Sequence, residues 1–212
     1  MIVRDTGALR KAQLEISRKV LVRDVLPRRI RTIGGFDVAY RNGYALSAGV
    51  VLDFETLEIV EKKLIRSRAD FPYIPTFLSF REGPPIIKTY KNLENTPDIL
   101  MINGQGIAHP LRAGLASHIG VVLGKPSIGV AQRRLVGEFR EPESTGDVSQ
   151  LFYEGLQVGW VLKSAPRSRP IFISPGHMIS LETSLKIVKK CLKGRKLPEP
   201  LVLAHKLSKI FK

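Results

Sequence analysis

Residues 98–102, DILMI, read as a strand with no polar face, because four apolar residues follow one another before Asn103 and a glycine turn. Side chains of a strand alternate between its two faces. A strand that is apolar at successive positions must therefore be covered on both faces, as the inner strands of α/β sheets are. The chain consequently needs packed layers on either side of this segment.

Three strand-like runs precede this segment, at residues 33–40, 44–54 and 57–66. The sequences between them, RNG at 41–43 and DFET at 53–56, are typical of turns. Strands joined by turns this short pair as antiparallel neighbours. We therefore predict an antiparallel meander before the buried strand.

The rest of the chain alternates between helical and strand-like patterns. These patterns predict helices at 6–26, 85–94, 108–124, 180–194 and 199–211, strands at 127–131, 156–164 and 169–174, and a surface loop at 133–150. A meander followed by strand–helix alternation indicates an α/β fold with a mixed β-sheet flanked by helices. The ribonuclease H-like fold is built this way, although the pattern alone does not separate it from other mixed folds. No repeat or linker divides the chain, so we expect a single domain over residues 1–212.

Charge is the strongest compositional signal. The chain has 34 Lys and Arg against 19 Asp and Glu, which gives a formal net charge of +15. This excess favours an anionic partner, and nucleic acid ranks ahead of an acidic membrane surface or a generally basic proteome. No apolar run reaches transmembrane length, so no membrane insertion is expected. Cys191 is the only cysteine, which excludes an internal disulfide, and we expect a cytoplasmic protein.

Three ionisable residues stand where they could do chemistry. Asp37 lies inside the strand GGFDVAY, where a buried charge is costly unless it is paired or bound to a metal; an exposed strand face is the alternative. Glu82 follows FLSFR, and a solvated carboxylate beside Arg81 is the alternative. His205 falls on the apolar side of the last predicted helix, where it is either a catalyst or a packing residue.

Two short motifs could contact a nucleic-acid base. The turn NGQGIAHP, residues 103–110, allows close backbone approach at Gly104 and Gly106 and opens a helix whose first amides favour an anion. An ordinary strand–helix turn is the alternative. PYIP, residues 72–75, holds an aromatic residue between two prolines. Tyr73 could stack on bases or wedge between them, and a tyrosine that caps the core is equally compatible.

Taken together and in this order, these motifs resemble endonuclease V, the deoxyinosine-directed nuclease family. The matching segments are IGGFDVAY, PYIPTFLSFREGP, MINGQGIAHPLRAGLASHIGVVLGKPSIGVA, SPGHMISLETS and LAHKL, which spread over residues 33–207. The resemblance implies a ribonuclease H-like fold and a DNA-repair endonuclease. It implies cleavage of the second phosphodiester bond 3′ to a hypoxanthine base, leaving 3′-hydroxyl and 5′-phosphate ends. The implied cofactor is Mg²⁺, with Mn²⁺ able to substitute.

The resemblance also assigns roles to residues of this chain. The catalytic positions of the family fall on Asp37, Glu82, Asn103 and His205, of which Asp37, Glu82 and position 103 are the metal ligands. Carboxylates that hold divalent cations suit phosphodiester cleavage, because the cation activates water and stabilises the growing charge. The strand-separating wedge falls on Pro72, Tyr73, Ile74 and Pro75, with Tyr73 at its tip. The region that receives the flipped base falls on Gly104, Gln105, Gly106 and His109.

Two positions depart from the family pattern. Asn103 stands where the family has Asp, and Gln132 stands where it usually has Lys. An amide oxygen can coordinate a cation but brings no charge, so we expect weak metal binding and low activity. Arg133 or Arg134 could take the place of the missing Lys.

Three functions remain open on the sequence alone. The first is a DNA-repair endonuclease impaired by Asn103, and the second is a non-catalytic protein that binds deaminated bases. The third is an inosine-specific ribonuclease, because contacts to a 2′-hydroxyl cannot be read from motifs. The expected partner is deoxyinosine-containing DNA, with inosine-containing RNA as the alternative, and we expect a monomer.

Overall fold

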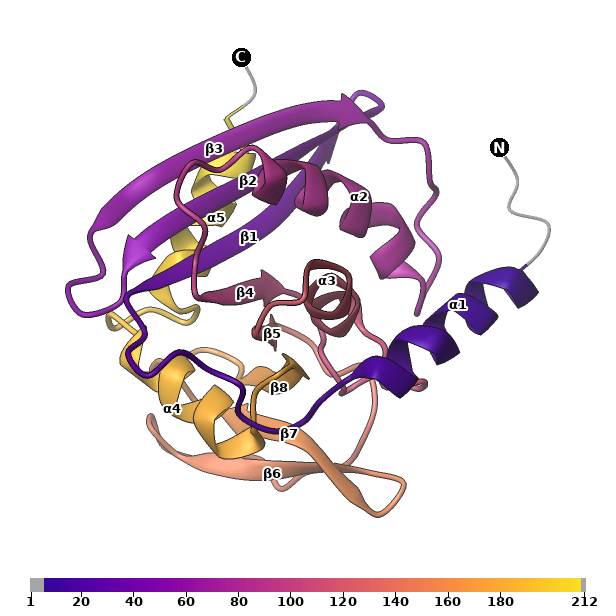
Figure 1. The fold of residues 1–212 in the computed structure, drawn as a ribbon. Helices are drawn as coiled ribbons and strands as arrows, with labels where there is room; N and C mark the ends of the chain where they lie inside the picture. The colour runs from indigo at the N-terminus through magenta and orange to yellow at the C-terminus, as the bar shows by residue number, and fades with distance from the viewer. Residues whose placement is uncertain (1–5, 211–212) are drawn as a thin grey trace.

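The computed structural model describes residues 6–210, in which one mixed sheet carries helices on its faces (Figure 1). The eight strands run in the order β3-β2-β1-β4-β5-β8-β7-β6. They are β1 Thr32–Arg41, β2 Tyr44–Asp53, β3 Ile59–Arg68, β4 Ile99–Asn103, β5 Ser127–Ala131, β6 Val148–Tyr153, β7 Leu156–Leu162 and β8 Ile171–His177. The helices are α1 Thr6–Lys19, α2 Leu78–Lys91, α3 Leu115–Leu123, α4 Leu181–Lys190 and α5 Glu199–Ser208.

The predicted meander is confirmed. β1 pairs with β2, and β2 with β3, in antiparallel fashion. The turn between β1 and β2 has positive φ at Asn42 and Gly43, 49° and 76°, as a two-residue hairpin turn requires. β4 then lies parallel to β1 and to β5, and β8 returns antiparallel to β5. This is an α/β fold of the ribonuclease H-like class, as predicted.

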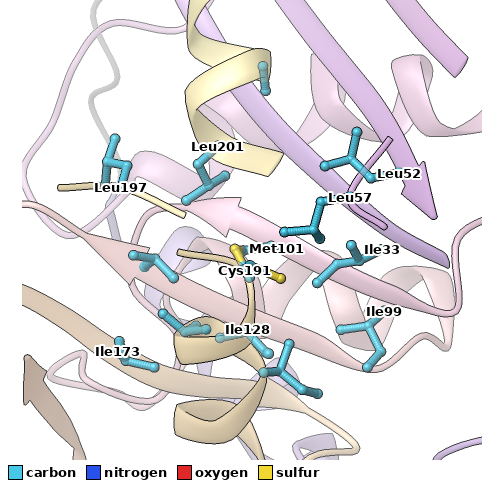
Figure 2. Packing of buried hydrophobic residues seen from close by; sticks show 14 of the residues in the cluster. Ile33, Leu52, Leu57, Ile99, Met101, Ile128, Ile173, Cys191, Leu197 and Leu201 are labelled. Carbon is cyan, nitrogen blue, oxygen red and sulfur yellow. The ribbon is translucent and has the colours of Figure 1, made fainter. Parts of the chain in front are cut away.

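β4 is covered on both faces, which confirms the prediction from its apolar run. Ile99 and Met101 pack into one core cluster with residues of α4 and α5 and with Cys191, which directly follows α4 (Figure 2). Leu100 and Ile102 pack into a second cluster with residues of α2 and α3. β4 is thereby held rigidly at the centre of the sheet, and its last residue, Asn103, is placed at a strand end.

The first helix is shorter than predicted. α1 ends at Lys19, whereas periodicity predicted a helix to residue 26. The next residues bond elsewhere: the N–H of Leu21 donates to Nδ1 of His177 at 3.2 Å, and that of Val25 to the carbonyl of Met178 at 3.0 Å. Hydrogen bonds to the end of β8 thus replace the helical ones, and the exposed side chains of Leu21 and Val25 offer no packing gain from a helix.

The second helix begins earlier than predicted. α2 starts at Leu78, not at residue 85, and contains Pro84 and Pro85. Pro85 has no N–H, so the carbonyl of Arg81 loses its helical partner. The hydroxyl of Tyr40 on β1 donates to that carbonyl at 3.2 Å. The tertiary bond satisfies the freed carbonyl, and Glu82 consequently lies on a helix and not in a loop.

The helix predicted at 108–124 is also shorter. α3 begins at Leu115, and the residues before it form tight turns, with the N–H of Arg112 bonded to the carbonyl of His109 at 2.8 Å. The N–H of Ala116 in its first turn donates to the carbonyl of Gln105 at 2.9 Å. The glycine turn therefore does not open directly into a helix, and this amide is already used within the protein. The predicted stop at Gly124 is confirmed, with φ of 60°.

The remaining predictions hold in outline. Ser180 caps α4, because its hydroxyl accepts from the N–H of Thr183 at 3.1 Å, but the helix ends at Lys190 and not at residue 194. β7 and β8 pair as predicted, and β6 occupies the end of the predicted loop. α5 ends at Ser208; residue 211 of its predicted range lies outside the described residues. No helix within residues 6–210 is long and apolar enough to span a bilayer.

Candidate active site

Asp37 and Asn103 face each other across two neighbouring parallel strands. β1 and β4 are in register at Phe36 and Ile102, which brings the next residue of each strand side by side. Nδ2 of Asn103 donates to Oδ1 of Asp37 at 2.8 Å. Asp37 is only 6% exposed, so the exposed strand face considered for it is wrong. Its carboxylate is a buried charge that depends on its partners.

The last helix supplies the second partner of Asp37. Nδ1 of His205 lies 2.7 Å from Oδ2 of Asp37, and the hydroxyl of Ser208 donates to the same oxygen at 3.3 Å. The two residues are three apart in α5 and so share one face of the helix. The side chain of His205 is 38% exposed, which does not fit a residue buried for packing. It can therefore meet Asp37 on one side and solvent on the other.

Gly35 explains how α5 comes so close to β1. A Cβ at this position would lie 2.2 Å from the carbonyl oxygen of Pro200, a distance that no side chain tolerates. The absent side chain lets the first turn of α5 rest directly on the strand. His205, one turn further along the helix, is thereby brought to Asp37.

Glu82 approaches the same place from α2. Burial, and secondly the charge of Asp37, raises the pKa of Glu82 to about 8, and the neighbouring Arg81 acts in the opposite direction. Glu82 is half-buried, so it is not the fully solvated carboxylate considered for it. A cation beside Glu82 would offset the burial and the neighbouring negative charge that disfavour its ionised form.

Tyr40 and Arg81 form a neighbouring contact that sequence patterns did not reveal. The guanidinium of Arg81 lies over the Tyr40 ring, 4.0 Å from its centroid. Burial, and then the charge of Glu82, raises the pKa of the Tyr40 hydroxyl to about 12. Pro85 was the one sequence feature that could have indicated this contact. A proline inside a helix leaves a carbonyl without its N–H partner, so another donor is needed.

The donor set fits a hard divalent cation. Asp37 and Glu82 offer carboxylate oxygens, Asn103 offers an amide oxygen, and oxygen is the ligand type that Mg²⁺ prefers. The raised pKa of Glu82, caused by burial and secondly by the charge of Asp37, points the same way, because a cation there would stabilise the ionised carboxyl group. Within residues 6–210 no group of three or more His, Cys, Asp and Glu side chains is placed to hold a metal. The set here is two carboxylates and one neutral amide.

A cavity of about 500 Å³ adjoins this centre through Asn103. Its lining includes Tyr73, Thr76, Gln105, His109, Gln132 and Arg133. Tyr73 is 67% exposed, so the core-capping tyrosine considered for it is wrong. The flanking Pro72 and Pro75 are also exposed. The exposed ring of Tyr73 therefore projects beside a cavity whose lining includes Asn103, the residue that contacts Asp37.

The glycine turn divides between the cavity and the core. Gly104 and Gln105 line the cavity, and Nε2 of Gln105 donates to the carbonyl of Arg133 at 2.9 Å. Gly106 instead packs against β8, where a Cβ would lie 2.0 Å from the carbonyl oxygen of Pro175. Its N–H donates to the hydroxyl of Ser174 at 2.8 Å. The absent side chain at Gly106 thus serves close packing of the turn against the sheet.

The position that departs from the expected Lys also lies at this cavity. Gln132, Arg133 and Arg134 are consecutive, exposed and part of its lining. Arg134 donates from Nη1 to the carbonyl of Gly137 at 3.0 Å. The two guanidinium groups give this rim a positive charge beside the carboxyl centre.

Comparison with known proteins gives a consistent result over most of the chain. The family model described as Endonuclease V matches residues 14–206. Endonuclease V of Thermofilum pendens is 44% identical over 197 residues, covering 92% of this chain and 84% of the relative. The crystal structure of the Bacillus subtilis endonuclease V superposes with a TM-score of 0.90 at 29% identity, covering 99% of this chain and 92% of that one.

A further solved structure includes nucleic acid. It is the Ciona intestinalis endonuclease V in complex with a 24mer DNA that contains an inosine followed by a ribo-adenosine. It superposes with a TM-score of 0.80 at 28% identity, covering 96% of this chain and 95% of that one.

Proposed function

This chain belongs to the endonuclease V family of nucleases, and we propose that its substrate is DNA containing deoxyinosine. In this proposal a monomer of one domain recognises the deaminated base. It cuts the second phosphodiester bond on the 3′ side of the lesion and leaves 3′-hydroxyl and 5′-phosphate ends. The proposed cofactor is Mg²⁺, for which Mn²⁺ can substitute.

One observation carries the proposal: the cavity beside Tyr73 and the carboxyl centre at Asp37 are adjacent but distinct, and they meet at Asn103. A base must leave the duplex before a pocket can inspect it, and the weak pairing of hypoxanthine lowers the cost. An exposed aromatic side chain can fill the gap that the base leaves. A pocket separate from the reacting centre supports cleavage at a bond displaced from the recognised base.

The roles proposed for individual residues follow from their contacts. Asp37, Glu82 and the amide oxygen of Asn103 would hold the cation, which would activate water and stabilise the charge on the phosphate. His205 is fixed by Asp37 through Nδ1, which leaves Nε2 for the phosphate or a water molecule. Burial raises the pKa of Glu82 to about 8, and a bound cation would favour its ionised form.

Asn103 supports the proposal that this chain is a low-activity variant of its family. Its Nδ2 donates to the Asp37 oxygen at 2.8 Å, so an N–H group stands where a third carboxylate would add negative charge. The amide brings no charge to the cation, and the site binds the metal less strongly. This proposal predicts good binding of inosine-containing DNA and poor cleavage.

A ribonuclease role is the second candidate, and one observation favours it. The substrate strand in the Ciona complex carries a ribo-adenosine directly after the inosine. A 2′-hydroxyl near the inosine is therefore accommodated by that relative. A non-catalytic role has less support, because Asp37 and His205 are in contact and the charge of Asp37 acts on Glu82.

Single-turnover cleavage separates these candidates. The substrates are matched strands with one hypoxanthine, in all-DNA form, with one ribonucleotide after the lesion, and in all-RNA form, each with Mg²⁺ and then Mn²⁺. The chain as given should cut slowly, and Asn103→Asp should cut at least about 100-fold faster, by analogy with losing one transition-state contact. The faster strand type identifies the substrate. A chain that binds the lesion but stays inactive with Asp at position 103 would point to the binding-protein role.

A further inference from the structure

Thr76 adopts an unfavourable backbone conformation at the end of the PYIP loop, residues 72–75. Its φ is +67°, and the N–H of Phe77 donates to the carbonyl of Ile74 at 3.0 Å. A turn with proline second and a positive φ third is of type II, and glycine is the residue that suits the third position. Thr76 is β-branched, so the conformation is strained and persists only if the surroundings hold it.

Two buried side chains hold this turn through one atom, the carbonyl oxygen of Thr76. Nε2 of Gln13, from α1, donates to it at 2.6 Å, and Nε2 of His109 lies 2.8 Å from it. Gln13 is 1% exposed and His109 3% exposed. Both donor side chains are therefore shielded from water, so either would be costly to leave without its acceptor.

The proton position on His109 follows from a second contact. The N–H of Leu111 donates to Nδ1 of His109 at 3.1 Å. Nδ1 must therefore be unprotonated, so Nε2 carries the proton and donates to Thr76. His109 faces the loop with its one donor, although it also lines the cavity. The family resemblance gave His109 a role in base binding, and the structure adds a contact between His109 and the loop.

Gln13 is unusual within its own helix. It is the buried residue of α1, whereas the adjacent Leu14 is 44% exposed. A helix that buries an amide and exposes a leucine is placed by hydrogen bonding more than by apolar packing. The bond to Thr76 gives a physical reason for this arrangement.

We propose, building on the proposed function, that Gln13 and His109 are positioning residues for base extrusion. They fix the turn at Thr76 so that Tyr73 is held ready to enter the duplex as the deaminated base leaves it. Thr76 and Tyr73 both line the cavity, so the turn connects the projecting ring with the cavity wall. Neither Gln13 nor His109 acts on the scissile phosphate in this role.

Binding and base unstacking are the measurements that test this proposal, and neither requires cleavage. The probe is a duplex with one deoxyinosine and 2-aminopurine as its neighbour, whose fluorescence rises when the bases unstack. Gln13→Met and His109→Leu should each weaken duplex binding about tenfold, the effect of one buried hydrogen bond, and should reduce the fluorescence rise. For Gln13→Met, which alters no residue of the cavity lining, binding to the same lesion in single-stranded DNA should change less than about twofold, because there is no duplex to separate.

Two variants test whether the contact itself matters. His109→Gln places an amide N–H near the position of Nε2 and should restore most of the duplex binding. Thr76→Gly removes the strain, because glycine suits this turn position, so Gln13→Met should cost less in that background than in the original chain.

Ser164→Ala is the matched control for loss of stability. The Ser164 hydroxyl is buried and donates to a distant carbonyl, that of Lys196, at 2.6 Å, and Ser164 is not part of the cavity lining. This variant should lower the melting temperature and leave the fluorescence rise unchanged.

The outcomes distinguish this inference from the proposed function. If the unaltered chain binds inosine and adenine duplexes equally, the proposed function itself fails. If it prefers inosine and Gln13→Met leaves duplex affinity and fluorescence unchanged, the positioning role is overturned and the proposed function stands. Equal weakening of duplex and single-strand binding would likewise overturn it.

Discussion

At the scale of single residues, Asn103 changes the charge of the centre. Nδ2 of Asn103 donates to Asp37 at 2.8 Å and adds no charge to the centre. An aspartate at position 103 would instead place a second negative charge beside Asp37. In metal-free buffer Asn103→Asp should therefore melt at a lower temperature than the chain as given. Added Mg²⁺ should raise the melting temperature of Asn103→Asp more, because the cation binds the folded state more strongly. Equal responses to Mg²⁺ in the two proteins would show that position 103 is not a metal ligand.

Glu82 makes stability depend on pH in a direction opposite to that of most carboxylates. Its pKa in the folded chain is about 8, above the usual value of 4.5. Between these values the folded state binds a proton that the unfolded state lacks, so stability falls as pH rises. The contribution of Glu82 to the free energy of unfolding is fully present below about pH 4.5 and is lost as pH rises to about 8. The limiting slope of this free energy against pH is about 1.4 kcal/mol per pH unit.

Thermal melting of the chain and of Glu82→Gln, from pH 5 to 8 in chelator, isolates this effect. The difference in stability between the two proteins should change steadily across that range in favour of the variant. Burial lowers the pKa of His109 and His177, which gives stability that grows as pH rises through the usual histidine range in both proteins. Parallel curves for the two proteins would rule out the raised pKa of Glu82.

At the scale of elements, the docking of α5 on β1 decides where His205 stands. Gly35→Ala should push the helix away, because a Cβ would lie 2.2 Å from the backbone oxygen of Pro200. We expect a loss of about 1–3 kcal/mol in unfolding free energy, as for other overpacked sites. In the Asn103→Asp background it should also slow cleavage beyond what the loss of folded protein explains.

Gly34→Ala is the control on the same strand. Its Cβ would lie 2.7 Å from the Pro97 ring and not against α5. This variant should lose stability and keep normal cleavage per folded molecule. Normal cleavage in Gly35→Ala as well would mean that α5 does not need its close approach to place His205.

Secondary structure was predictable where it depended on local pattern. The meander, the buried strand β4 and the Ser180 cap follow from alternation, turn residues and capping chemistry. Helix boundaries failed where tertiary hydrogen bonds compete with helical ones. α1 stops because later N–H groups bond to His177 and Met178. α2 continues through two prolines because Tyr40 supplies a donor to the carbonyl of Arg81.

At the scale of the whole molecule, the net charge of +15 should dominate affinity for DNA. Each phosphate contact releases counterions, so log affinity should fall linearly with log salt. Discrimination between inosine and adenine should persist better than affinity, because phosphate contacts do not read bases. Titrations of inosine and adenine duplexes over a series of salt concentrations check both statements.

Two single-charge variants locate the contacts on the surface. Arg133→Gln, at the cavity rim, should reduce the salt slope by about 0.9, the value for one phosphate contact. Lys189→Gln, on the exposed side of α4, should leave it unchanged. If the affinity of the unaltered chain does not change with salt concentration, the basic surface does not contribute to DNA binding.

The sequence by itself determined the family, the α/β class and the identity of the polar residues at Asp37, Glu82, position 103 and His205. These rest on local pattern and on motifs whose order is readable along the chain. Only the tertiary structure decided that Asp37 is shared by Asn103 and His205, that burial raises the pKa of Glu82, and that Thr76 is held by Gln13 and His109. The physical reason is that hydrogen-bond partners and desolvation depend on which distant segments meet. Gln13 and Thr76 are separated by 63 positions in the chain, and no local period links them.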